Sequence, residues 1–335
     1  MKMTTRELGS TNLRLSTMGL GTWTFGGGDY KFGWGPQDDK ESIATIRRAV
    51  EMGINWFDTA PSYGSGRSEK IIGQALKEIS ENILVATKCG VRMAENKEDI
   101  LFNLKRDSLR KEVENSLKRL QLETIDLYMI HKPMPEEELE EGWSTLIDLK
   151  KEGKIRHAGV SSLSIEQLKR VQAIHPVAFI QPEYNMLEPD IENKLLPYCA
   201  ENNIGVIVYS PMASGLLTGK FTREKYESLP DDDWRRESDP HFEEPNFSTI
   251  LNLIESLKPI AEKNNKTPAQ LAVAWVLRRS EVTSAIVGAR KAYQIEQTIP
   301  AGNWVLSDED KAQLDHLLTN YYTLMKKIKS GNQDG

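Results

Sequence analysis

The chain has 335 residues and a formal net charge of −6; hydrophobic residues make up 39% and charged residues 27%, a mixture that is ordinary for a globular protein. Two cysteines, Cys89 and Cys199, are too few for a disulfide framework, and the acidic charge argues against a nucleic-acid-binding protein. The sequence has no run of 18 apolar residues and no apolar signal segment near its start, so we expect a cytoplasmic protein that does not contact membranes.

Short apolar runs rich in β-branched residues recur along the chain, and helix-period segments lie between them. The runs are continuous rather than alternating, which is typical of strands covered on both faces. They predict strands at residues 17–21, 54–58, 83–88, 125–131, 156–161, 179–181, 205–210 and 284–288. Apolar residues three and four positions apart predict helices at residues 39–52, 68–77, 107–120, 137–152, 164–174, 189–202, 248–264 and 268–279.

Eight strands that alternate with helices predict an α/β fold with a parallel sheet. Eight such units fit a closed (β/α)8 TIM barrel better than an open Rossmann sheet. A Rossmann sheet would also have the G-x-G-x-x-G turn after its first strand, and residues 19–23 read GLGTW instead.

The segments outside the predicted units also carry expectations. Residues 8–11 (LGST) predict a hairpin turn that plugs the floor of the barrel. The loops 24–38 and 221–245 are long enough to indicate a functional role at the C-terminal face. We expect residues 1–325 to form a single domain and the polar tail 326–335 to be disordered.

Polar side chains end three consecutive strands, at the edge where barrels of this type place their active residues. Asp58, Lys88 and His131 end the second, third and fourth strands, and Tyr63 follows Asp58 by five residues. Alone, each has an ordinary structural explanation as a turn cap, a rim aromatic or a structural histidine. An unpaired buried ammonium is costly, however, so Lys88 needs a carboxylate, and the neighbouring strand offers Asp58. The coincidence of the four residues indicates an active site.

Together these residues suit the donation of a proton to a carbonyl oxygen. A phenol has an ordinary pKa of about 10, and a nearby ammonium such as that of Lys88 would lower it. Tyr63 would then be the general acid, Asp58 would hold Lys88, and His131 would orient the substrate oxygen. The set supplies no electrons, so a hydride donor must bind beside it.

The four residues resemble the catalytic tetrad of the aldo-keto reductases. The likeness extends over about residues 5–320, and its motifs are residues 57–64 (FDTAPSYG), 86–88 (ATK), 126–131 (DLYMIH), 153–156 (GKIR) and 159–161 (GVS). Within that family the chain is most similar to the bacterial general-stress and inositol-operon reductases, which are related to potassium-channel β subunits. The resemblance implies NADPH-dependent reduction of aldehydes, ketones or sugars by a monomeric TIM barrel.

The resemblance also implies cofactor-binding residues. Thr22 and Trp23 would lie near the nicotinamide, Ser161, Ser162 and Gln181 would bind its carboxamide, and Tyr209 would stack on the ring. The pyrophosphate would follow Ser210, Pro211, Met212, Gly215, Leu216 and Lys220, with Arg236 closing over it. Gly288, Arg290 and Gln294 would surround the adenosine end, where a guanidinium can grip the 2′-phosphate that distinguishes NADPH from NADH. Relatives commonly have Asn at position 162 and Glu-Asn at positions 297–298, where this chain has Ser and Gln-Thr.

Aromatic residues in the loop 24–38 indicate a substrate pocket. Phe25, Tyr30, Phe32 and Trp34, together with Trp23, predict a pocket for flat or apolar carbonyl compounds or for sugars.

Two other functions are compatible with parts of this pattern. Lys88 alone would suit a barrel aldolase that forms a Schiff base. A redox-sensing, nicotinamide-binding partner protein like the channel β subunits would share the cofactor residues but not need the complete tetrad. The five histidines do not form the spacings of a metal site, so we predict no metal.

Overall fold

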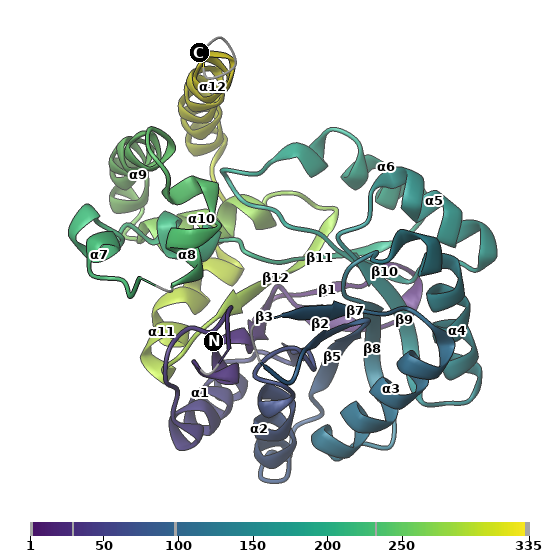
Figure 1. Ribbon diagram of the computed structural model, residues 1–335. Coiled ribbons are helices and arrows are strands. Elements are labelled where there is room, and N and C mark those ends of the chain that lie inside the picture. Colours follow the sequence, from purple (N-terminus) through teal and green to yellow (C-terminus); the bar gives the residue numbers. More distant parts are fainter. Residues whose placement is uncertain (1–2, 29, 97–98, 232, 332–335) are drawn as a thin grey trace.

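The computed structural model describes residues 3–28, 30–96, 99–231 and 233–331, and within them eight parallel strands close into a barrel (Figure 1). The strands are β3 (Met18–Gly21), β4 (Trp56–Asp58), β5 (Leu84–Cys89), β8 (Ile125–Ile130), β9 (Ile155–Ser161), β10 (Phe179–Gln181), β11 (Gly205–Val208) and β12 (Val282–Gly288). The barrel closes where β12 pairs with β3, with Ala285 opposite Met18. The predicted TIM barrel is confirmed. Strands β8 and β11 end earlier than predicted, so His131 and Tyr209 lie on the loops that follow.

Helices surround the barrel and bury their apolar faces against its strands (Figure 1). They include α1 (Asp39–Glu51), α2 (Arg67–Leu76), α3 (Arg106–Leu120), α4 (Leu139–Lys151), α5 (Ile165–Ile174), α6 (Leu195–Glu201), α9 (Asn246–Lys263) and α10 (Pro268–Leu277). Ser164 and Thr267 begin α5 and α10 with capping boxes, which satisfy backbone N–H groups that the first turn leaves unpaired. In the described residues, every helix is too short or too polar to span a lipid bilayer.

Several elements were not predicted from the sequence. They are the hairpin of β6 (Val91–Met93) and β7 (Ile100–Phe102), and helices α7 (Arg223–Glu227), α8 (Trp234–Glu237), α11 (Ala292–Thr298) and α12 (Asp308–Gly331). Helix α12 projects from the body of the molecule and packs against α9 (Figure 1). It continues to Gly331, so it enters the tail that we expected to be disordered from residue 326; residues 332–335 lie outside the described residues.

An N-terminal hairpin closes the barrel at the end opposite the predicted site. Strands β1 (Thr5–Glu7) and β2 (Arg14–Ser16) pair antiparallel across the turn that contains Leu8. Leu8 is fully buried and lies against Gly205, the first residue of β11. This hairpin agrees with the expected floor plug.

Large side chains fill the barrel interior beneath the site. Trp56 and Phe179 are fully buried there, and Trp56 Nε1 donates a hydrogen bond to Ser284 Oγ at 3.0 Å. Two glycines give these rings room, because a Cβ atom on Gly19 would lie 2.1 Å from Trp56 Cε2 and one on Gly159 would lie 2.4 Å from Phe179 Cζ. Close packing of this kind makes the strand ends a rigid support for the side chains at the mouth.

We expect Gly19→Ala to lower the free energy of unfolding by about 1–3 kcal/mol, because the added methyl group overpacks the Trp56 ring. Urea unfolding of the two proteins measures the change. The matched control is Gly288→Ala, since a Cβ atom at Gly288 meets no atom within 4 Å. A Gly19 variant as stable as the Gly288 variant would contradict the packing argument.

Candidate active site

The four residues at the predicted strand ends lie together at the C-terminal end of the barrel. Lys88 Nζ is 2.6 Å from Asp58 Oδ1 and 3.2 Å from Tyr63 Oη. Lys88 is 1% exposed and Asp58 is 3% exposed, so the ion pair is shielded from water. Tyr63 lies in the turn between β4 and α2, and the His131 ring packs edge-on to it, with ring centroids 6.1 Å apart.

The buried ion pair has all of its principal hydrogen bonds satisfied. Lys88 Nζ donates to Asp58, to Tyr63 and, at 2.9 Å, to the Thr59 carbonyl oxygen. The second oxygen of Asp58 accepts from Gln181 Nε2 at 2.8 Å. Burial lowers the pKa of Lys88, and the Asp58 carboxylate opposes that shift. An ammonium that donates all three N–H groups has no free lone pair, which disfavours a Schiff-base role for Lys88.

The pKa of Tyr63 differs from the expectation. We expected the ammonium of Lys88 to lower it, but burial, followed by the Asp58 carboxylate, raises the pKa of Tyr63 well above its usual value. The reason is that Asp58 neutralises the ammonium, so desolvation of the phenolate dominates. Tyr63 therefore keeps its proton at neutral pH, which is the form that a general acid requires.

His131 is held in its neutral form. Burial, followed by the positive charges of Lys88 and Lys132, lowers the pKa of His131 well below its usual value. A neutral imidazole has a single N–H donor. Within the described residues, the buried Nδ1 atom of His131 has no hydrogen-bond partner. The ring is thus suited to orienting a polar group by hydrogen bonding rather than by charge.

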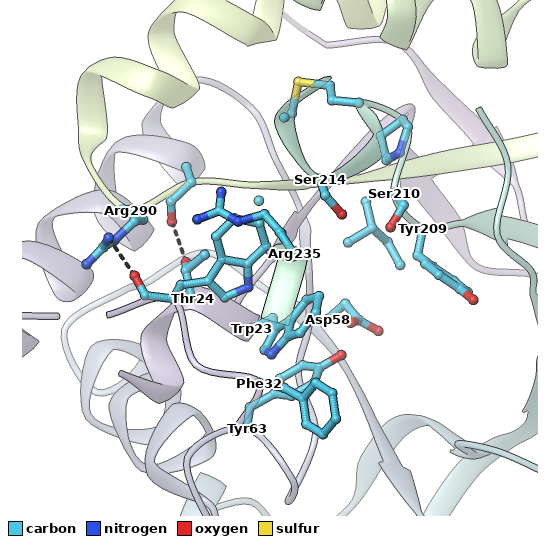
Figure 2. A pocket seen from close by; sticks show the side chains of 18 of the residues that line it. Trp23, Thr24, Phe32, Asp58, Tyr63, Tyr209, Ser210, Ser214, Arg235 and Arg290 are labelled. Carbon is cyan, nitrogen blue, oxygen red and sulfur yellow. Dashed lines mark hydrogen bonds between the residues drawn. The ribbon is translucent and has the colours of Figure 1, made fainter. Parts of the chain in front are cut away.

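A cavity of about 760 Å³ opens above these residues, at the C-terminal ends of the strands. Most of the predicted binding residues line it. From the predicted cofactor set these are Trp23, Ser161, Ser162, Gln181, Tyr209, Ser210, Pro211, Met212, Gly215, Lys220, Gly288, Arg290 and Gln294, and from the predicted substrate set Trp23, Tyr30, Phe32 and Trp34. Figure 2 shows several of these side chains, with Trp23, Phe32 and Tyr63 grouped at one end of the cavity.

Lys88 lies beneath the cavity without lining it, and four of the predicted binding residues do not line it either. Thr22 is buried, and its hydroxyl donates to the Asp58 carbonyl oxygen at 2.8 Å. Phe25 and Leu216 belong to the core between the barrel and its helices. Arg236 contacts its own loop through the Leu229 carbonyl oxygen at 2.9 Å and Asp231 at 3.0 Å.

The structure adds cavity residues that the sequence reasoning missed. The neighbour of Arg236, Arg235, lines the cavity and places its guanidinium 4.8 Å from the centre of the Trp34 ring. The others include Thr24, Lys132, Lys225 and four apolar residues of the β6–β7 hairpin, Val91, Met93, Ile100 and Phe102. The alternation Val91-Arg92-Met93 is a strand signal that would have indicated this hairpin.

Charge is distributed unequally over the cavity wall. Five cationic side chains line it: Lys132, Lys220, Lys225, Arg235 and Arg290. In the described part of the chain the only carboxylate on that wall is Asp58, which is paired with Lys88. Ser210, Ser214 and Gly215 on the same wall adopt left-handed backbone conformations with φ of 55°, 53° and 97°. Such conformations gather at ligand sites, and the cationic wall suits a polyanion.

Arg290 contacts the loop 24–38 through three groups. Its Nε donates to Gln37 Oε1 at 2.9 Å, one terminal nitrogen donates to the Trp34 carbonyl oxygen at 2.8 Å, and the other donates to that of Pro36. A guanidinium has five N–H donors. Among the described residues, two N–H donors of Arg290 therefore remain for a ligand. Arg290 holds the loop 24–38 in place and also lines the cavity.

Three tryptophans connect the two long loops above Tyr63. The Trp23 ring stacks on Tyr63 with centroids 6.2 Å apart, and it also lies 5.5 Å from Trp34 and 5.4 Å from Trp234. Trp234 begins α8, so this aromatic cluster joins the loop 24–38 to the segment that carries Arg235.

Comparisons with known proteins match the chain to one family. A family model described as the aldo/keto reductase family matches residues 17–319. The aldo-keto reductase YhdN of Bacillus subtilis is 39% identical over 317 residues, covering 94% of this chain and 93% of that protein. The NADH-specific methylglyoxal reductase of Escherichia coli is 37% identical over 316 residues, covering 90% of this chain and 94% of that protein.

A solved structure shows the same likeness. The glycerol dehydrogenase AKR11B4 from Gluconobacter oxydans superposes with a TM-score of 0.86 at 39% sequence identity, and the match covers 95% of each chain.

Proposed function

Because this chain belongs to the aldo/keto reductase family, whose members are oxidoreductases that act on carbonyl compounds with a nicotinamide cofactor, we propose that it reduces aldehydes or ketones to alcohols with NADPH, and that Tyr63 is the general acid. The observation that carries the proposal is the contact of Tyr63 Oη with Lys88 Nζ at 3.2 Å, beside His131 on the wall of one cavity.

The side chains of this site are arranged to deliver one proton. When bound, the nicotinamide supplies the hydride. Tyr63 Oη transfers its proton to the carbonyl oxygen of the substrate, which becomes strongly basic as the carbonyl carbon accepts the hydride. Lys88 then stabilises the phenolate that is left, and Asp58 keeps Lys88 charged and in place. The neutral His131 donates its N–H to the same oxygen and orients the carbonyl group.

The cavity fits a dinucleotide. Its excess of cationic residues suits a pyrophosphate, and the left-handed residues Ser214 and Gly215 let backbone N–H groups approach an anion closely. Tyr209 and the predicted carboxamide-binding residues line the same cavity as Tyr63, in which the hydride must be delivered. A carbonyl compound small enough to share this space with the cofactor is the expected substrate.

The direct test is to mix the protein with NADPH and methylglyoxal, the substrate named for the relative from Escherichia coli, and to follow the loss of reduced-cofactor absorbance. We expect turnover with this or another small aldehyde. A protein that binds the cofactor but turns over no aldehyde or ketone would instead be a nicotinamide-binding partner protein.

We expect NADPH to raise the melting temperature more than NADH at equal concentration, because Arg290 has N–H donors left for a 2′-phosphate. A ligand at 100 times its Kd adds about 2.7 kcal/mol to the free energy of unfolding. Arg290→Met should reduce the NADPH shift more than the NADH shift. The NADH shift is the internal control, since loosening of the loop 24–38 affects both cofactors. Equal shifts in the unmodified protein would contradict the 2′-phosphate contact of Arg290, and a larger shift with NADH would favour NADH, which the relative from Escherichia coli is named for.

A further inference from the structure

Lys132 is a cation on the cavity wall that has no part in the proton transfer described above. It follows His131 directly on the loop after β8, and both residues line the cavity. Its ammonium reaches across the ends of two further strands: Nζ donates to Ser162 Oγ, after β9, at 3.1 Å, and lies 5.9 Å from the centre of the Tyr209 ring, after β11. The side chain is therefore directed along the wall of the cavity rather than out into solvent.

The charge of Lys132 is not neutralised by the protein. In the described part of the chain no carboxylate forms an ion pair with this half-buried lysine, whereas the fully buried Lys88 is paired with Asp58. Burial lowers the pKa of Lys132, and the more distant Glu183 carboxylate only partly opposes this. A partly desolvated ammonium that lacks a counter-charge is unfavourable, and a bound anion would reduce that cost.

The residues around Lys132 indicate whether such an anion belongs to the cofactor or to the substrate. The cationic residues Lys220 and Arg290 contact Gln297 and Gln37 rather than residues of the tetrad, and they suit the phosphates of a dinucleotide. Lys132 instead adjoins His131, which faces the reacting carbonyl in the proposed function. Apolar side chains of the β6–β7 hairpin, such as Met93 and Phe102, line the same cavity and would pack against the body of a substrate.

We propose that Lys132 is a specificity-determining residue that binds a carboxylate carried by the carbonyl substrate, so that the enzyme favours aldehydes and ketones with an anionic group. The inference rests on the proposed function, because it assigns the substrate class of the same site. The carboxylate is only bound: the hydride and the proton still go to the carbonyl carbon and oxygen, and no bond to the carboxylate changes.

The test compares an anionic and a neutral aldehyde of similar shape, 4-carboxybenzaldehyde and 4-nitrobenzaldehyde. The quantity measured is the ratio of their kcat/KM values, since intrinsic reactivity cancels when the ratio is compared between variants. Lys132→Met should lower the ratio by about tenfold or more, the cost of losing one charge-assisted hydrogen bond. Lys132→Arg keeps the positive charge, so this variant should keep most of the preference for the anionic aldehyde.

The matched control is Lys169→Met. Lys169 on α5 also lies over a tyrosine ring, 5.7 Å from the centre of Tyr198, but it does not line the cavity. Its removal changes the net charge equally, and the ratio should stay as in the unmodified protein. Equal losses in the two methionine variants would overturn the proposal, because net charge alone would then explain the preference.

Two further outcomes separate the inference from the function on which it rests. An unchanged ratio in Lys132→Met, or a loss of the melting-temperature shift with NADPH in that variant, would overturn the proposal and assign Lys132 to another role or to the cofactor. In both cases the reductase function stands. If the unmodified protein reduces neither benzaldehyde nor any other carbonyl compound with either cofactor, the proposed function itself fails.

Discussion

Tyr63→Phe is expected to reduce kcat for carbonyl reduction by about 10²–10⁴-fold, the usual contribution of a positioned general acid. Burial already keeps the phenol protonated, and phenylalanine removes that proton while preserving the ring that stacks on Trp23. Steady-state kinetics with a small aldehyde measure the effect. The melting-temperature shift with NADPH should persist, because the pyrophosphate and adenosine ends of the cavity are unchanged.

The matched control is Tyr198→Phe, which removes a phenol from α6 on the outside of the barrel, away from the cavity. It should have the kcat of the unmodified protein. Substantial activity in Tyr63→Phe would remove Tyr63 as the acid and leave His131 as the remaining donor of the tetrad on the cavity wall.

Lys88→Met is expected to lower the free energy of unfolding by about 3–5 kcal/mol, because it leaves the Asp58 carboxylate buried without a counter-charge. Urea unfolding measures this loss. The exposed pair of Lys258 with Glu255 is the comparison, since Lys258→Met should cost no more than about 1 kcal/mol. Activity should also fall severely, since no cation remains to stabilise the Tyr63 phenolate.

A double variant separates the two roles of Lys88. In Lys88→Met with Asp58→Asn the buried charge is gone, and Asn can still accept the hydrogen bond from Gln181. We expect much of the lost stability to return while activity stays low. Recovery of activity together with stability would show that Lys88 supports the fold alone and has no part in proton transfer.

The barrel strands and the residues at their ends could be predicted, because short stretches of sequence determine them. The strands of the barrel are buried on both sides, so they read as continuous apolar runs, and short connections fix their order. The positions of Asp58, Lys88 and His131 followed from the strand ends, since parallel strands present their C-terminal ends at one rim.

The directions of several side chains in the site depend on how distant segments of the chain pack together, and no short stretch of sequence reveals that packing. Arg235 rather than Arg236 faces the cavity because α8 is oriented by the packing of Trp234 on Trp23. The hydrogen bonds of Arg290 to carbonyl groups of the loop 24–38 could not be predicted, because they join segments more than 250 residues apart. The direction of the Tyr63 pKa shift depends on how deeply the phenol is buried and on how closely the Lys88 and Asp58 charges offset each other. Only the folded structure gives both quantities.

The contacts among Trp23, Trp34 and Trp234 give this protein an intrinsic optical signal. Indole emission responds to neighbouring rings and charges, and these three rings lie within 5.4–5.7 Å of one another, with a guanidinium over one of them. Any ligand that displaces α8 alters that emission, whereas the remaining four of the seven tryptophans give a steady background. A displacement of α8 during a single turnover would therefore change the fluorescence of the unlabelled chain.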